Sequence, residues 1–124
     1  MRTPITYYGG KQNLSERIVS MMPRHKIYCE PFFGGGAVFF AKPKAGIEVI
    51  NDKNDLLINF FKVCQSASKF KELRERIRLS LHSESDYIRA RNIYRGRSEV
   101  SDVDKAWAVW IMANECHSGS LYGG

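Results

Sequence analysis

The apolar positions in the first half of the chain predict short helices that alternate with short strands. Near residues 14–22 they recur at the three- and four-residue spacing of a helix, and Pro23 follows this run. Two short runs of β-forming residues come next, separated by glycines and a short helical run. The expected elements are a helix at about 14–22, a strand at 26–29, a helix at 37–41, a strand at 46–50 and a helix at 55–65.

The second half of the chain carries only helical patterns. Phe70, Leu73, Ile77 and Leu81 mark one helix, and two more are expected at 87–94 and 104–114. The order of elements in the first half is that of the opening of a doubly wound α/β sheet. A sheet of two strands is barely stable by itself. We therefore expect the chain to stop before its sheet is complete.

Composition favours a globular domain over a membrane or metal protein. The 124 residues are 44% hydrophobic and 26% charged, which is enough for one domain with a modest core. No apolar run approaches the roughly 18 residues of a membrane span, and the N-terminus lacks a signal peptide, so we expect a cytoplasmic protein. Cys29, Cys64 and Cys116 are scattered, which predicts free thiols. Cys116 and His117 lack partners for a metal site.

The net charge of +6 is concentrated in one segment. Residues 69–97 hold nine Lys or Arg against four acids, a local net charge of +5. Such a segment suits a polyanionic partner, whose binding releases counterions. It also suits a solvated helix face that only keeps the protein soluble, and charge alone leaves the two interpretations even.

A glycine-rich loop follows the first predicted strand. Glu30-Pro31-Phe32-Phe33-Gly34-Gly35-Gly36 precedes a short helix, so backbone N–H groups and close backbone approach are available to a nucleotide-type cofactor. No Gly-Lys-Ser/Thr follows, which excludes a P-loop. Phe39 stands where the third glycine of a dinucleotide motif belongs, which disfavours a dinucleotide. The alternative is a glycine turn without a ligand.

Asp52 lies at the end of the second predicted strand, 18 positions after Gly34. In this class of fold an acid at that place reaches the ribose hydroxyls of a cofactor. It could instead cap the following helix, but we expect Asp55 to be the cap.

The third notable segment is Tyr7-Tyr8-Gly9-Gly10-Lys11, ahead of the first helix. It could form a flap in which Lys11 meets a carboxylate and Tyr7 covers an adenine or a sulfonium. Alone it would be a turn with a surface lysine.

Together the three segments resemble the Dam-like, or D12, class of DNA adenine N6-methyltransferases. The family's aromatic-x-Gly-Gly-Lys corresponds to residues 7–11, its Glu-Pro-Phe-x-Gly-x-Gly to residues 30–36, and its Asp-x-Asn to residues 52–54. The motifs occur in the family's order. The resemblance covers residues 3–65 well and the helical remainder more loosely.

The resemblance implies an α/β, partial Rossmann-like S-adenosylmethionine-dependent methyltransferase fold. Residues 1–66 would be its cofactor-binding part, and residues 67–124 a basic helical region leading into the target-recognition domain. Lys11 would lie near the carboxylate of S-adenosylmethionine, and Asp52 would hold the ribose. Glu30 would face the ammonium or be structural. The implied cofactor residues are Tyr7, Gly9, Gly10, Lys11, Glu30, Pro31, Phe32, Gly34, Gly36 and Asp52.

The same resemblance implies double-stranded DNA as the partner. The basic helices would contact its phosphates, which positions the protein without specifying sequence. Four arginines that cluster towards a loop are the first candidates: Arg89, Arg91, Arg95 and Arg97.

The chain departs from the family at one point, since it contains no Asp-Pro-Pro-Tyr, the family's catalytic tetrapeptide. That motif holds a flipped adenine by its amino group. We therefore expect an N-terminal fragment, inactive alone, that could self-associate through unfinished sheet edges. Two alternatives remain: a non-catalytic DNA-binding or regulatory module, and a methyltransferase acting on RNA or a small molecule.

Overall fold

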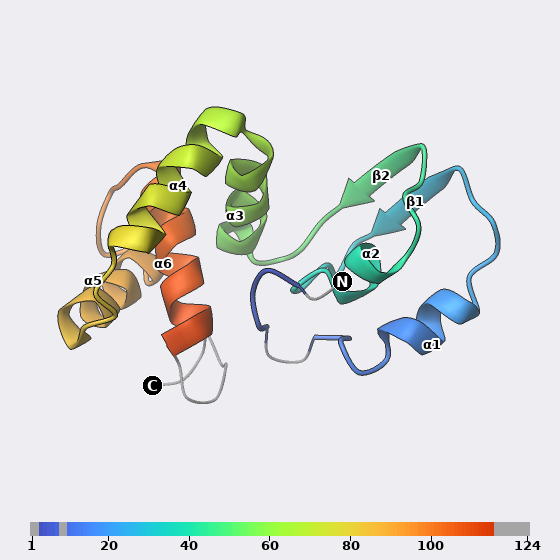
Figure 1. The fold of residues 1–124 in the computed structure, drawn as a ribbon, viewed down its shortest axis with the longest axis horizontal. Coiled ribbons are helices and arrows are strands. Elements are labelled where there is room, and N and C mark those ends of the chain that lie inside the picture. The colour runs from blue at the N-terminus through green and yellow to red at the C-terminus, as the bar shows by residue number, and fades with distance from the viewer. Residues whose placement is uncertain (1–2, 8–9, 116–124) are drawn as a thin grey trace. The chain divides into compact units, whose positions relative to one another are not determined.

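The computed structural model describes residues 3–7 and 10–115, and Figure 1 shows their fold. The chain forms two compact units, one ending at Lys53 and the other beginning at Asn54. Among the described residues, no helix is long and apolar enough to cross a bilayer.

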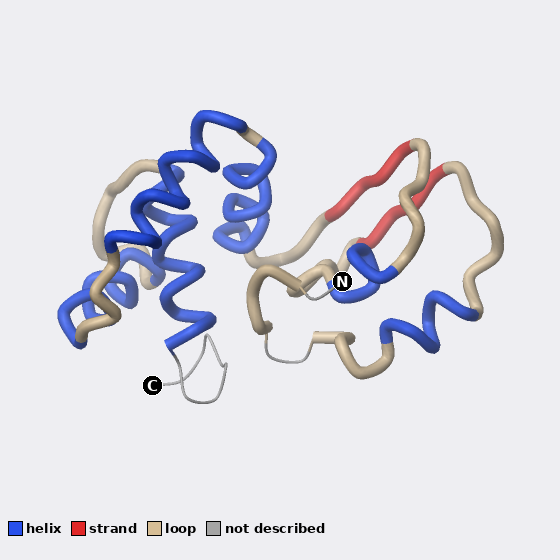
Figure 2. The backbone as a smooth tube through the Cα atoms, viewed as in Figure 1, coloured by secondary structure: helices blue, strands red, loops and turns tan. Residues whose placement is uncertain are grey.

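Within its described residues, the first unit contains two helices and a parallel pair of strands. In chain order these are α1 (Ser15–Ser20), β1 (Ile27–Glu30), α2 (Ala37–Ala41) and β2 (Ile47–Ile50). The register pairs Ile27 with Ile47 and Glu30 with Ile50. The strands are parallel, so their carboxyl ends meet at one edge of the sheet, and Figure 2 shows the two strands side by side in red. These elements appear in the order that the sequence predicts.

The two faces of this sheet differ in how they are covered. Tyr28 on one face packs near Phe39 of α2, with ring centroids 6.5 Å apart. On the opposite face Ile27, Ile47 and Val49 remain exposed. Parallel sheets are normally covered on both faces. The first unit therefore has the mixed helix and short parallel sheet of a partial α/β fold, with one apolar face open.

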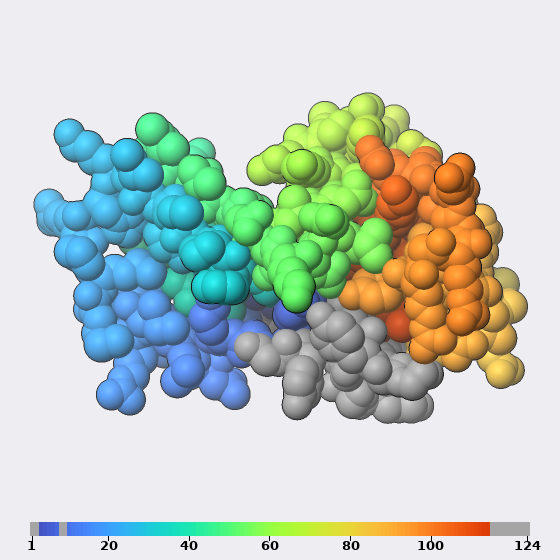
Figure 3. Space-filling view, turned by 180° about the vertical axis from the view of Figure 1, so that it is seen from behind, coloured from blue at the N-terminus to red at the C-terminus, as the bar shows by residue number. Residues whose placement is uncertain are grey.

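The described part of the second unit, residues 54–115, is a bundle of four helices. They are α3 (Asp55–Gln65), α4 (Ala67–Leu79), α5 (Glu84–Tyr94) and α6 (Asp102–Glu115). Helix α6 contacts each of the other three, and its Ala106, Val109 and Ile111 are fully buried. In Figure 3 only a strip of its red-orange atoms is visible between green α3 and the orange segment that precedes α6. The apolar α6 is therefore the core of the bundle.

Helix starts are where the sequence prediction and the structure differ. Asn54, not Asp55, caps α3: its side chain accepts hydrogen bonds from the N–H groups of Leu56 and Leu57. The prediction of Asp55 as the cap was wrong. Helices α4, α5 and α6 also begin two or three residues before the starts expected from the sequence, after Ser66, Ser83 and Ser101. Each of these serines accepts a backbone N–H three residues on, so a polar first turn is helical.

The boundary between the compact units falls before α3 because α3 packs on α6 and α4. The division at residues 66 and 67 is a functional one, between cofactor binding and target recognition. It stays a prediction.

Candidate cofactor site

The loop after β1 is shaped by its glycines. Gly34 and Gly36 have φ values of 55° and 77°, in the left-handed region. A Cβ on Gly36 would come within 2.6 Å of the buried Phe33 ring and 2.9 Å of Phe40. Glycine is thus required at position 36 by the backbone and by packing, and α2 begins directly after it.

Asp52 closes the other side of this loop. Its Oδ2 accepts a hydrogen bond from the backbone N–H of Gly34 at 2.8 Å. Backbone hydrogen bonds continue past the ends of β1 and β2 and bring the loop close to Asp52. The N–H of Asn51 donates to the carbonyl of Glu30, and the N–H of Phe33 donates to the carbonyl of Asn51, both at 2.9 Å. The two features that the sequence places 18 residues apart therefore meet at the carboxyl ends of β1 and β2.

Lys11 and Glu30 form an ion pair beside the loop. Lys11 Nζ lies 2.5 Å from Glu30 Oε1 and also donates to the carbonyl of Phe32 at 3.0 Å. Glu30 is buried, and its Oε2 accepts from the hydroxyl of Tyr28 at 2.8 Å. Burial, followed by the hydrogen bond to the Glu30 carboxylate, raises the pKa of the Tyr28 hydroxyl well above its usual range. No pattern in the sequence indicates that these residues pair.

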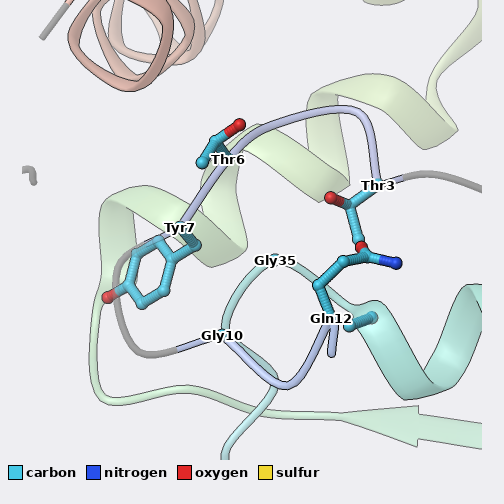
Figure 4. A pocket seen from close by; sticks show the side chains of 7 residues that line it. Thr3, Thr6, Tyr7, Gly10, Gln12 and Gly35 are labelled. Atoms are coloured by element: carbon cyan, nitrogen blue, oxygen red, sulfur yellow. The ribbon is translucent and has the colours of Figure 1, made fainter. Parts of the chain in front are cut away.

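A cavity of about 340 Å³ lies beside the loop. Figure 4 shows the Tyr7 ring on one side of Gly10 and Gly35, with the side chains of Thr3 and Gln12 on the other. The Tyr7 carbonyl accepts the N–H of Gly10 at 3.0 Å.

The cavity contains only some of the predicted residues. Tyr7 and Gly10 line it, and Gly9 lies outside the described residues. The other predicted residues are not among its lining residues: Lys11, Glu30, Pro31, Phe32, Gly34, Gly36 and Asp52. Pro31 is exposed and Phe32 is 79% exposed. Sequence reasoning missed five lining residues: Thr3, Thr6, Gln12, Gly35 and Ala37. The polar ones lie on either side of the aromatic-x-Gly-Gly-Lys segment in the sequence. Their closeness to this segment is the sequence feature that could have indicated them.

The four candidate DNA-binding arginines are not equivalent. Arg89 on α5 is exposed, as are Arg95 and Arg97 just after this helix. Arg91 is half-buried, with its guanidinium 5.9 Å from the centroid of the Tyr87 ring. Its Nε has no hydrogen-bond partner among the described residues. Arg91 is therefore the least available of the four for contact with phosphate.

Parallel strands whose carboxyl ends carry a glycine loop and an acid are the arrangement in which α/β proteins bind nucleotide-type cofactors. Over residues 3–7 and 10–115, no group of His, Cys, Asp and Glu could hold a metal ion.

Comparison with known proteins identifies the family. The model of the D12 class N6 adenine-specific DNA methyltransferases matches residues 7–122. The chain is 32% identical over 121 residues to a DNA N-6-adenine-methyltransferase of Escherichia phage P1. It is 47% identical over 57 residues to the type II methyltransferase M1.LlaDCHI of Lactococcus lactis subsp. cremoris. The chain belongs to the D12 class N6 adenine-specific DNA methyltransferase family.

The matches cover unequal shares of the proteins compared. The phage P1 alignment includes 95% of this chain but 16% of the relative, and the L. lactis alignment includes 44% of this chain and 19% of the relative. The chain thus spans a small part of the length of either relative.

Proposed function

We propose that the chain contains the S-adenosylmethionine-binding part of a DNA adenine N6-methyltransferase. In this proposal the first unit is the opening of a Rossmann-like fold. Residues 1–66 bind the cofactor, and residues 67–124 lead into target recognition. Family membership and the geometry at the carboxyl ends of β1 and β2 support it.

The observation that carries the proposal is the hydrogen bond from Gly34 to Asp52 at 2.8 Å. A carboxylate has about four acceptor positions, so Asp52 can hold the loop and also accept from ribose hydroxyls. The cavity of about 340 Å³ fits a small-molecule site. When bound, S-adenosylmethionine supplies a methyl group activated by its sulfonium.

Tyr7 and Lys11 would contact two charged groups of the cofactor, its sulfonium and its methionyl carboxylate. A ring contact attracts a sulfonium through cation–π interaction. An ammonium has three N–H donors, and two of those on Lys11 reach Glu30 and the carbonyl of Phe32. The third is suited to the methionyl carboxylate. Glu30 accepts on both oxygens, which favours its structural role over contact with the ammonium.

Cofactor titration tests the assignment of Asp52. S-adenosylmethionine is titrated calorimetrically into the wild type, Asp52→Ala and, as the control, Asp55→Ala, which removes a neighbouring exposed carboxylate. We expect Asp52→Ala to weaken binding at least tenfold, about 1.4 kcal/mol, and Asp55→Ala to leave it unchanged. Equal binding by the wild type and Asp52→Ala would exclude the ribose assignment, and no binding by the wild type would exclude a cofactor site in this chain.

The 124 residues contain no Asp-Pro-Pro-Tyr, so we propose that this chain alone transfers no methyl group. Transfer of labelled methyl to duplex DNA by the purified chain would contradict this part of the proposal.

A further inference from the structure

A second cavity lies at the opposite end of the same strands. It has a volume of about 450 Å³ and is formed by the segment before β1 and the segment between α2 and β2. Because β1 and β2 are parallel, both segments lie at the amino end of the sheet. The N–H of Ile47 joins them by donating to the carbonyl of Lys26 at 3.0 Å. We call this cavity the amino-end groove.

The amino-end groove has basic side chains and an apolar floor. Its basic members are Arg24, His25, Lys42 and Lys44, and none of its described lining residues is acidic. Val19 and Met22 contribute to its apolar lining. Arg24 and Lys44 are exposed and make no ion pair with any described residue. Both side chains can therefore reach an anion, although the Lys44 charge also contributes, after the N–H of Ala45 and Lys42, to the lowered pKa of the Glu48 carboxyl.

Lys42 has a different part in the groove. Its side chain is fully buried and pairs with Glu48. Its Nζ lies 4.2 Å from the centroid of the Tyr28 ring and donates to the carbonyl of Pro43 at 3.1 Å. Glu48 also accepts the N–H of Ala45 at 3.0 Å. These contacts neutralise Lys42 and fix the turn that presents Lys44.

The ring of His25 is also oriented. Its Nδ1 lies 2.9 Å from the carbonyl of Pro23, so Nδ1 carries the proton and donates it. This leaves Nε2 as an acceptor when His25 is neutral and a donor when it is charged. The ring lies 5.7 Å from that of Tyr28.

We propose that the amino-end groove binds the phosphate group of a nucleotide. Arg and Lys donors match phosphate oxygens, and the apolar floor suits the ring that a nucleotide attaches to its phosphate. A volume of about 450 Å³ lies in the range of small-molecule sites. The glycine loop lies at the carboxyl ends of the strands, so this site is distinct from the proposed cofactor site and does not rest on it.

The test uses 2′-deoxyadenosine 5′-monophosphate, deoxyadenosine and inorganic phosphate as probes. Each is titrated into the full chain while amide and His25 ring signals are followed by NMR, and affinities are measured by calorimetry. We expect the monophosphate to shift the signals of His25 and Lys44 and to bind more tightly than inorganic phosphate. Deoxyadenosine should leave these signals unchanged. Saturation with S-adenosylmethionine should not alter the affinity.

Two double variants that remove the same charge distinguish loss of the groove's own cations from a general effect of lower net charge. Arg24→Gln with Lys44→Gln should weaken monophosphate binding at least tenfold, because each charge-assisted contact contributes substantially to affinity. Arg17→Gln with Lys53→Gln removes two other exposed cations of the same unit and should change it less than twofold. Lys44→Arg should retain binding.

Four results would overturn the proposal. They are equal loss in the two double variants, shifts at residues 34–36 in place of residues 22–25 and 42–44, equal affinity for inorganic phosphate, and no binding of the monophosphate at millimolar concentration. Because every changed side chain is exposed, the amide spectra should show that the variants remain folded.

Discussion

Gly36 joins the glycine loop to α2 through a backbone conformation that other residues adopt at a cost. Its φ of 77° lies in the left-handed region, and Phe33 and Phe40 occupy the space where a side chain would begin. Gly96 has a similar φ of 71°, but a Cβ added there would meet no described atom within 4 Å. Comparing substitutions at Gly36 and Gly96 therefore separates the free-energy cost of the backbone conformation from the cost of packing.

Gly36→Ala should lower the free energy of unfolding by about 2–4 kcal/mol, from left-handed strain and displaced rings together. Gly96→Ala should lower it by about 1–2 kcal/mol, from strain alone. Urea unfolding followed by circular dichroism measures both. Equal losses would mean that the two phenylalanine rings move aside without cost.

The buried carboxylate of Glu30 accepts hydrogen bonds from two other side chains of the site. It accepts from Lys11 and from Tyr28 while only 5% exposed. A buried carboxylate is stable only when its oxygens have partners. The raised pKa of Tyr28 follows first from burial and then from this hydrogen bond, because an anionic tyrosine would face an anionic glutamate.

The Tyr28 pKa predicts a loss of stability at alkaline pH. Its folded value is raised, so the unfolded chain releases this proton first. The contribution of Tyr28 is complete below the unfolded pKa of about 10 and falls as pH rises beyond it. Urea midpoints from pH 8.5 to 11 should show the wild type losing its advantage over Tyr28→Phe. A constant difference between the two proteins would contradict the linkage.

At the scale of elements, the segment that leads into α3 contains two polar residues with different roles. Asn54 belongs to the family's Asp-x-Asn segment, and it caps α3 while its Nδ2 donates to the hydroxyl of Tyr94 at 2.8 Å. Asp52, two residues earlier, serves the glycine loop. Within this segment, the Asp52 carboxylate therefore binds the glycine loop, and the Asn54 side chain caps α3.

Asn54→Ala should lower the free energy of unfolding by about 1–2 kcal/mol, since it removes the cap of α3 and the bond to Tyr94. Asp55→Ala should lower it by at most about 0.5 kcal/mol, through loss of a favourable charge in the first turn. Thermal unfolding of the two variants checks the order. A larger loss in Asp55→Ala would restore Asp55 as the important residue of this helix start.

At the scale of the whole molecule, a positive net charge accompanies a two-stranded sheet with an exposed apolar face. The net charge is +6, and the exposed arginines of the second unit contribute to it. The apolar face of β1 and β2 is open. A positively charged surface suits a polyanionic partner, as the proposed function requires.

Replacing Arg89, Arg95 and Arg97 with Gln should weaken binding to duplex DNA and make it less dependent on salt. Each phosphate contact contributes roughly 0.9 to the slope of log K against log salt, so three lost contacts should reduce it by about 2.7. Fluorescence anisotropy from 50 to 200 mM salt measures the slope.

The control for this prediction changes three exposed cations of the first unit to Gln: Arg17, Lys26 and Lys53. It removes the same charge and should leave the slope closer to that of the wild type. Equal slopes for the two triple variants would show that net charge alone governs binding.

The local pattern of the sequence was sufficient for the elements and their order. Helix α3 runs over Asp55–Gln65 as predicted, because its apolar spacing and polar boundaries are properties of the segment itself. The glycine loop and Asp52 were likewise recognisable, since the backbone needs of a tight loop and the position of a strand end are local. Family membership followed from the same motifs.

Tertiary structure decided which of these side chains meet. Lys11 pairs with Glu30, and the side-chain amide of Asn54 donates to the hydroxyl of Tyr94. No spacing rule contains these contacts, because each depends on distances between segments set by packing. The sequence by itself was therefore sufficient for the elements and the family. The tertiary structure decided the contacts between distant segments, such as the ion pair of Lys11 with Glu30.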